Sequence, residues 1–146
     1  MKMKQKGIGK AVFKAGKAIW RMFPVILGTI LLVSIANTLI PKSFYTSVFR
    51  GNIFDPLFGS AIGSILIGNP IVSYIIGGEL LKKGISLVAV TAFIISWVTV
   101  GLVQFPAESS ILGKKFAIIR NISAFILAII SAVLTVLILN LFGLPV

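Results

Sequence analysis

Long apolar segments dominate the chain. Four of them run from Phe23 to Ile40, Leu57 to Leu81, Ile85 to Gln104 and Asn121 to Phe142, and Glu79 is the only charged residue within them. A helix needs roughly 20 residues to cross a hydrocarbon core of ~30 Å, so each segment is long enough to cross, the first only marginally. Their apolar residues do not alternate with polar ones, which favours helices over barrel strands. The sequence predicts an all-α integral membrane protein with about four hydrophobic helical segments in a single transmembrane domain, residues 23–146.

A basic arm, residues 1–22, precedes the first apolar segment. Its apolar residues Ile8, Val12, Ala15 and Ile19 and its basic residues Lys10, Lys14, Lys17 and Arg21 each recur at spacings of three and four. This pattern predicts a basic amphipathic helix that lies in the interface and binds anionic lipids. We interpret it as an anchor that holds the N-terminus in the cytoplasm. The alternative is a membrane-disrupting peptide, although three glycines in the arm weaken it as an independent helix.

The second apolar segment carries helix-breaking residues at its centre. Pro70 has no backbone N–H and biases Asn69 away from helical geometry, so Gly68-Asn69-Pro70 predicts a broken or re-entrant helix. Irregular backbone at membrane depth persists where it is buried in protein or lines a wet cavity, and transporters place binding sites there. A plain kink is the alternative, in which Gly59-x-x-x-Gly63 serves only close helix packing.

The residues of this break, together with polar residues near it and at the end of the third segment, are the candidate substrate-binding residues. They are Gly68, Asn69, Pro70, Ser73, Tyr74 and Gln104. A helix that begins at Pro70, with Asn69 as its N-cap, presents free amides and roughly half a positive charge. Such a helix end favours an anion or a polar neutral group.

Two carboxylates are candidates for proton or ion coupling. Glu79 lies within an apolar segment, where burial must be matched by a proton, an ion or a partner charge. Its alternative role is an ion pair with Lys82 or Lys83, one helical turn away. Glu108 follows Pro106, and its alternative role is a solvated side chain in an interfacial turn.

The path of residues 57–81 stays open. If this segment crosses the membrane, the cytoplasmic side holds nine Lys and Arg residues and the other side five. If it turns back as a re-entrant hairpin, the count is ten against four, which the positive-inside bias slightly favours.

Composition excludes most catalytic chemistry. The chain has no Cys, no His and three acidic residues, so disulfides, Cys or His metal sites and nucleophilic triads are excluded. We expect no enzyme activity, no cofactor and no metal. The net charge is +11, and most of the basic residues lie beside apolar segments. This placement favours anionic lipid over nucleic acid as the partner.

One part of the chain is similar to a known family. Residues 68–113 contain Asn69-Pro70, a leucine-rich turn ending at Gly84, and the Ala-x-x-Ala-Phe helix at Ala89 to Phe93. This region resembles the predicted permeases of the ArsP type. Full-length members look like two related halves, so the resemblance implies a half-size permease acting as a homodimer. Members thought to handle arsenicals carry cysteines around the break, and arsenical transport is therefore not implied here.

These observations together predict a half-size permease in the cell membrane, with a cytoplasmic N-terminus. It acts as a homo-oligomer, for which the family resemblance implies a dimer, and moves a small solute or ion through a cavity at the broken helices. The alternatives are a membrane-permeabilising, holin-like or structural membrane protein, and an accessory membrane subunit.

The arm provides a first test. Replacing Lys2, Lys4, Lys6, Lys10, Lys14 and Lys17 by Gln should give mixed topology, because the remaining charges are nearly balanced across the membrane. A reporter fused to the N-terminus measures the orientation. A reporter that stays fully cytoplasmic contradicts the anchor role.

Overall fold

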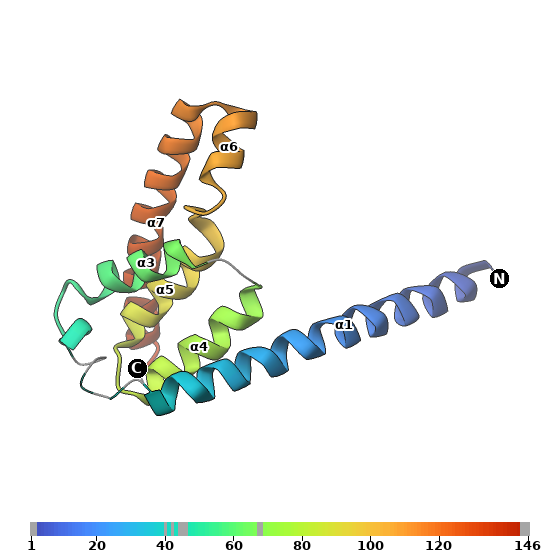
Figure 1. Cartoon of the computed structure of the whole chain (residues 1–146), viewed down its shortest axis with the longest axis horizontal. Coiled ribbons are helices and arrows are strands. Elements are labelled where there is room, and N and C mark those ends of the chain that lie inside the picture. Colours follow the sequence, from blue (N-terminus) through green and yellow to red (C-terminus); the bar gives the residue numbers. More distant parts are fainter. Residues whose placement is uncertain (1–2, 40, 42, 44–46, 67–68, 144–146) are drawn as a thin grey trace. The chain divides into compact units, whose positions relative to one another are not determined.

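The computed structural model describes residues 3–39, 41, 43, 47–66 and 69–143 (Figure 1). Within these residues every regular element is a helix, which confirms the predicted all-α class. The chain divides into two units, Met1–Leu39 and Ile40–Val146.

The first unit is one helix, α1 (Met3–Leu39), of 37 residues. It continues through Pro24, so no helix end separates the basic arm from the apolar residues that follow. Lys10, Lys14, Lys17 and Arg21 are exposed and, by their spacing, share one face. The rings of Trp20 and Phe23 stack with centroids 5.9 Å apart.

The second unit packs around one central helix. Its elements are α3 (Asp55–Ile65), α4 (Pro70–Lys82), α5 (Leu87–Thr99), α6 (Phe105–Leu112) and α7 (Lys114–Leu141). Helices α3, α4 and α7 all contact α5, and α6 lies beside the first part of α7 (Figure 1). The buried residues of α5 include Ala89, Phe93, Ser96 and Trp97. The core therefore follows α5.

Local sequence sets the helix ends. The Asn69 side chain accepts a hydrogen bond from the Ile71 amide at 3.0 Å, which confirms its N-cap role at the start of α4. Gly84 has a φ of +85° in the turn between α4 and α5, and Gly113 has +89° between α6 and α7. Other residues rarely adopt such angles, so these glycines permit the short connections. Residues 67 and 68 lie outside the described residues, and the break at Gly68-Asn69-Pro70 stays a prediction.

Small residues hold α3 against α5. A Cβ added at Gly59 would lie 2.2 Å from the carbonyl oxygen of Ala89, and one at Gly63 would lie 2.3 Å from that of Phe93. Between these contacts, the buried hydroxyls of Ser60 and Ser96 are hydrogen-bonded. The predicted close contact at Gly59-x-x-x-Gly63 is confirmed, and it forms within one chain.

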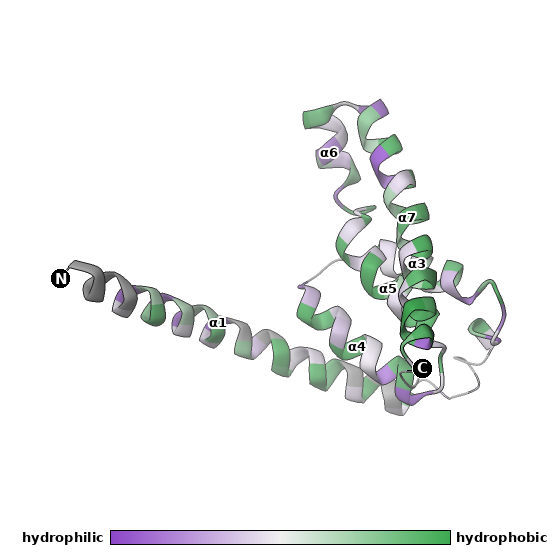
Figure 2. Cartoon of the chain, turned by 180° about the vertical axis from the view of Figure 1, so that it is seen from behind, coloured by the Kyte–Doolittle hydropathy of each residue, from purple (hydrophilic) through white to green (hydrophobic). Residues whose placement is uncertain are grey.

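Among the helices that the structure describes, two are long and apolar enough to cross a membrane. They are the part of α1 from Gly9 to Leu32 and the whole of α7. Most of α7 is hydrophobic, with hydrophilic residues concentrated near α6 (Figure 2). By length and composition, these helices indicate a membrane location.

The other two predicted spans are shorter as helices. The second apolar segment contains α3, of 11 residues, and α4, of 13, and the third contains α5, of 13. At ~1.5 Å per residue, these helices reach about 16 to 20 Å, less than a ~30 Å hydrocarbon core. Ser86 caps α5 at one end, and extended backbone at Val100 ends it at the other. The structure thus shows two candidate spans where the sequence predicts four.

The α3–α5 contact predicts opposite effects for two glycine substitutions. Gly63→Ala should lower the free energy of unfolding by about 2 kcal/mol or more, because the new methyl group meets backbone that cannot give way locally. Gly78→Ala on α4 is the matched control, since no atom lies within 4 Å of its added Cβ. It should raise stability by about 0.5 to 1 kcal/mol through helix propensity. Thermal unfolding in a neutral detergent, followed by circular dichroism, measures both, and equal shifts contradict the packing.

Candidate functional site

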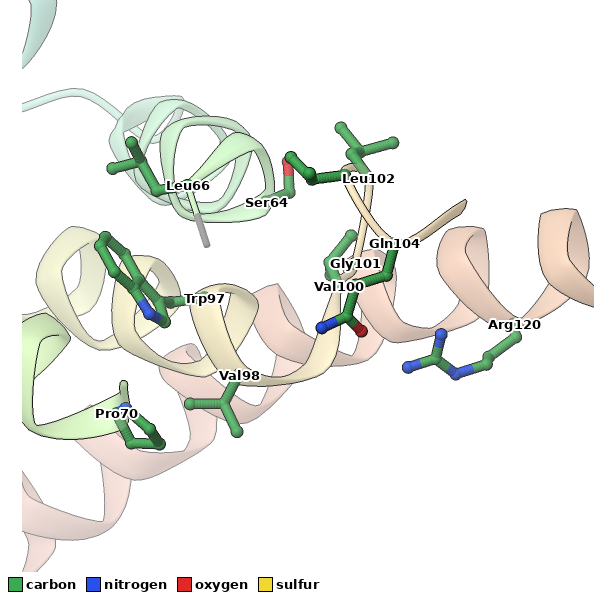
Figure 3. Close-up of a pocket in the computed structure, with 11 residues that line it drawn as sticks. Ser64, Leu66, Pro70, Trp97, Val98, Val100, Gly101, Leu102, Gln104 and Arg120 are labelled. Atoms are coloured by element: carbon green, nitrogen blue, oxygen red, sulfur yellow. The ribbon is translucent and has the colours of Figure 1, made fainter. Parts of the chain in front are cut away.

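A pocket of about 140 Å³ lies where several helix ends of the second unit meet. Residues at the end of α3, the first residue of α4, the last turn of α5, the turn at residues 100–104 and one residue of α7 line it (Figure 3). We call it the helix-end pocket. Its lining residues are Ser64, Leu66, Pro70, Trp97, Val98, Val100, Gly101, Leu102, Val103, Gln104 and Arg120.

Arg120 is the one charged residue lining this pocket in the described part of the chain. Its Nη1 donates to Oε1 of Glu108 in an ion pair, and its Nη2 donates to the carbonyl of Thr99 at 3.3 Å. The Arg120 side chain is 35% exposed and that of Glu108 17% exposed. Arg120 therefore lines the pocket, while its partner carboxylate is more buried and is not among the lining residues.

Asn121 ties this ion pair to the turn after α5. Its side chain is buried, and its Nδ2 donates to Oε2 of Glu108 at 3.2 Å and to the carbonyl of Ala117 at 2.9 Å. Its Oδ1 accepts the Gly101 amide at 2.9 Å. Both oxygens of Glu108 thus have donors, and the non-helical turn at residues 100–104 is fixed to α7.

The structure brings two of the predicted substrate-binding residues together. Pro70 and Gln104 line the same pocket. Ser73 is buried, and its hydroxyl donates to the Pro70 carbonyl at 2.7 Å, so it supports the first turn of α4. Tyr74 is 61% exposed and does not line the pocket, while Gly68 lies outside the described residues.

The two coupling candidates lie in different places. Glu79 pairs with Lys82 at 2.8 Å, which is the ion pair that its spacing offered as an alternative. It lies nine residues after Pro70, about 14 Å along α4 at ~1.5 Å per residue, and it does not line the helix-end pocket. Glu108 reaches the pocket through Arg120.

Sequence reasoning missed Arg120, Asn121 and Trp97. Arg120 enters the sequence prediction only through the Lys and Arg count that bears on topology, and no site role is predicted for Asn121 or Trp97. A signal did exist, because an arginine and an asparagine lie near the start of the long apolar helix α7, and a carboxylate precedes the arginine by twelve residues. Such polar groups at an apolar helix need partners, and Glu108 was available.

Comparison of the chain with known protein families, with curated proteins and with solved structures gives no match.

Asn121 provides the test of this arrangement. Asn121→Ala should lower the free energy of unfolding by about 2 kcal/mol, because it leaves the Gly101 amide and a Glu108 oxygen without partners. The Gly101 amide should also exchange faster with deuterium. Asn140→Ala, an exposed position on the same helix, is the control and should change neither quantity. Unchanged protection of Gly101 in Asn121→Ala contradicts the role.

Proposed function

We propose that the chain is a membrane permease that moves a small solute through the helix-end pocket. The observation that carries this proposal is the guanidinium of Arg120 at a pocket where helix ends meet, whose other lining residues are uncharged. An arginine in such surroundings is costly and commonly marks a substrate or ion pathway. Helix ends facing one cavity are also how transporters form midplane sites.

The proposed permease is a homo-oligomer, most simply a dimer. The helix-end pocket is small, and large apolar side chains stay exposed on α7, among them Leu127, Leu134 and Leu137. A second copy of the chain that packs along these surfaces would enclose a continuous path for the solute. The likeness of residues 68–113 to ArsP-type permeases, whose members look like two related halves, supports the same assembly.

The lengths of α3 and α4 fit two half-helices of a re-entrant segment. Each is shorter than a hydrocarbon core of ~30 Å. In this proposal, the basic stripe of α1 (Lys10, Lys14, Lys17 and Arg21) keeps the N-terminus in the cytoplasm of the cell-membrane protein.

Glu108 is the proposed coupling group. When it takes a proton, the charge on Arg120 loses its compensating carboxylate, and solute binding is linked to proton binding. Glu79 stays a second candidate, and its ion pair with Lys82 supports a structural role instead.

A membrane-permeabilising protein is the second candidate function. The exposed cationic stripe of α1 favours it, because such helices bind anionic lipid surfaces. Release of an entrapped fluorescent dye from vesicles of phosphatidylglycerol distinguishes the two functions. A pore-former releases the dye, whereas a permease retains it.

Flux into proteoliposomes tests the permease. The solutes are a panel of small anions, cations and metalloids, measured with and without a pH gradient. Asn69→Ala and Pro70→Ala should each reduce flux severalfold with the oligomer intact, because they change the helix end that forms the pocket wall. Glu108→Gln should abolish the effect of the pH gradient, and Glu79→Gln should alter it only if Glu79 is the coupling residue. Absence of flux for the whole panel contradicts the proposal.

A further inference from the structure

The helix-end pocket has the features of an anion site. Arg120 supplies its one charge within the described residues, and Gln104 adds an amide group (Figure 3). Glu108 does not line the pocket, and both of its oxygens already accept hydrogen bonds from Arg120 and Asn121. Among the described residues, the pocket therefore has no lining carboxylate for a cation, and its one charged group is the Arg120 guanidinium, which is ion-paired with Glu108.

The guanidinium of Arg120 retains donors for a ligand. It contacts Glu108 through one Nη atom and the Thr99 carbonyl through the other, so it does not form the parallel two-bond fork with the carboxylate. A guanidinium carries more N–H donors than these two acceptors use. The remaining donors match the planar geometry of a carboxylate or the oxygens of a phosphate.

The volume of the pocket limits the ligand. A cavity of about 150 Å³ is known to hold benzene, so the 140 Å³ here suits about six non-hydrogen atoms. Beside the polar side, Leu66, Pro70 and Val98 give an apolar wall. This wall is complementary to a short hydrocarbon part of the ligand and not to a second charged group on it.

We propose that the helix-end pocket binds a small oxyanion, held by Arg120 and Gln104. The ligand has about six non-hydrogen atoms in all and carries a carboxylate or phosphate group. The proposal rests on the permease function in naming its substrate class. Binding itself is independent of transport, so the two can fail separately.

Trp97 gives a direct reporter of binding, because it lines the same pocket and the only other tryptophan, Trp20, lies on α1. In a Trp20→Phe background, the full-length protein in neutral detergent is titrated with sodium acetate and sodium phosphate. Acetamide, a neutral analogue of acetate, and choline chloride are the control ligands. We expect a saturable change in Trp97 emission with the oxyanions and none with the controls. An equal response to acetamide overturns the proposal.

Variants then test the residue assignment. Arg120→Gln should weaken acetate binding at least about tenfold, because it removes charge-assisted hydrogen bonds. Lys115→Gln is the matched control, since it removes an exposed charge from the same helix, and it should bind as the parent does. Glu108→Gln should tighten binding at least about threefold, because the guanidinium loses its competing charge. Parent-like affinity in a folded Arg120→Gln protein overturns the assignment.

Two further variants serve if Arg120→Gln alone does not fold. Arg120→Lys keeps the charge without the planar fork and should bind acetate more weakly than the parent. The Glu108→Gln, Arg120→Gln pair replaces the ion pair with two amides and should lose binding while keeping its helical circular dichroism. Parent-like affinity in both variants overturns the proposal.

The source of the oxyanion is resolved in nanodiscs of phosphatidylcholine and of phosphatidylglycerol. A response of Trp97 to phosphatidylglycerol, lost in Arg120→Gln, assigns the oxyanion to a lipid headgroup and supports the shared chemistry. Oxyanion binding without flux in proteoliposomes supports the site and contradicts the permease. Flux of cations or neutral solutes without oxyanion binding supports the permease and overturns the site.

Discussion

The approach of α3 to α5 over Gly59 and Gly63 sets the geometry of the second unit. The two glycines are one helical turn apart, and carbonyl groups of Ala89 and Phe93 occupy the space that side chains would take. In a bilayer, apolar side chains gain little by leaving lipid, so helix association depends on such close backbone packing and on hydrogen bonds like that of Ser60 with Ser96. With this contact in place, the end of α3 lies beside the end of α5 and closes one wall of the helix-end pocket.

Polar contacts fix the turn that follows α5. The backbone from residue 100 to 104 is not helical, and its groups need partners. Asn121 supplies one for Gly101, and Arg120 supplies one for the carbonyl of Thr99. Glu108 in turn holds both of these α7 side chains. The turn, the ion pair and the pocket are therefore parts of one hydrogen-bonded arrangement.

Local features of the fold could be predicted from the sequence. Apolar composition gave the helical class, spacing gave the glycine contact, and the Asn69-Pro70 pair gave the start and cap of α4. The lengths of the helices could not be predicted as well. The end of α5 near Val100 depends on a contact with Asn121, twenty residues beyond the turn that it holds. A hydropathy pattern contains no information on such a distant partner.

The candidate site was predictable only in part for the same reason. Pro70 and Gln104 were found because they interrupt apolar segments, which is a local signal. Arg120 faces the pocket because the turn at Gly113 brings α6 back along α7 and places Glu108 beside it. Arg120 lies at the edge of a long apolar segment, as do ordinary basic residues that set membrane orientation. Only its tertiary partners distinguish it from them.

The contact between α3 and α5 also governs how this chain can vary. Positions 59 and 63 admit a single residue type, since any added carbon atom meets backbone oxygen. The exposed apolar positions of α7, such as Leu127 and Leu134, face no such limit within one copy of the chain, where they can exchange among residues of similar hydrophobicity. Tolerance to mutation in the second unit should therefore be lower at Gly59 and Gly63 than at many of its largest apolar residues.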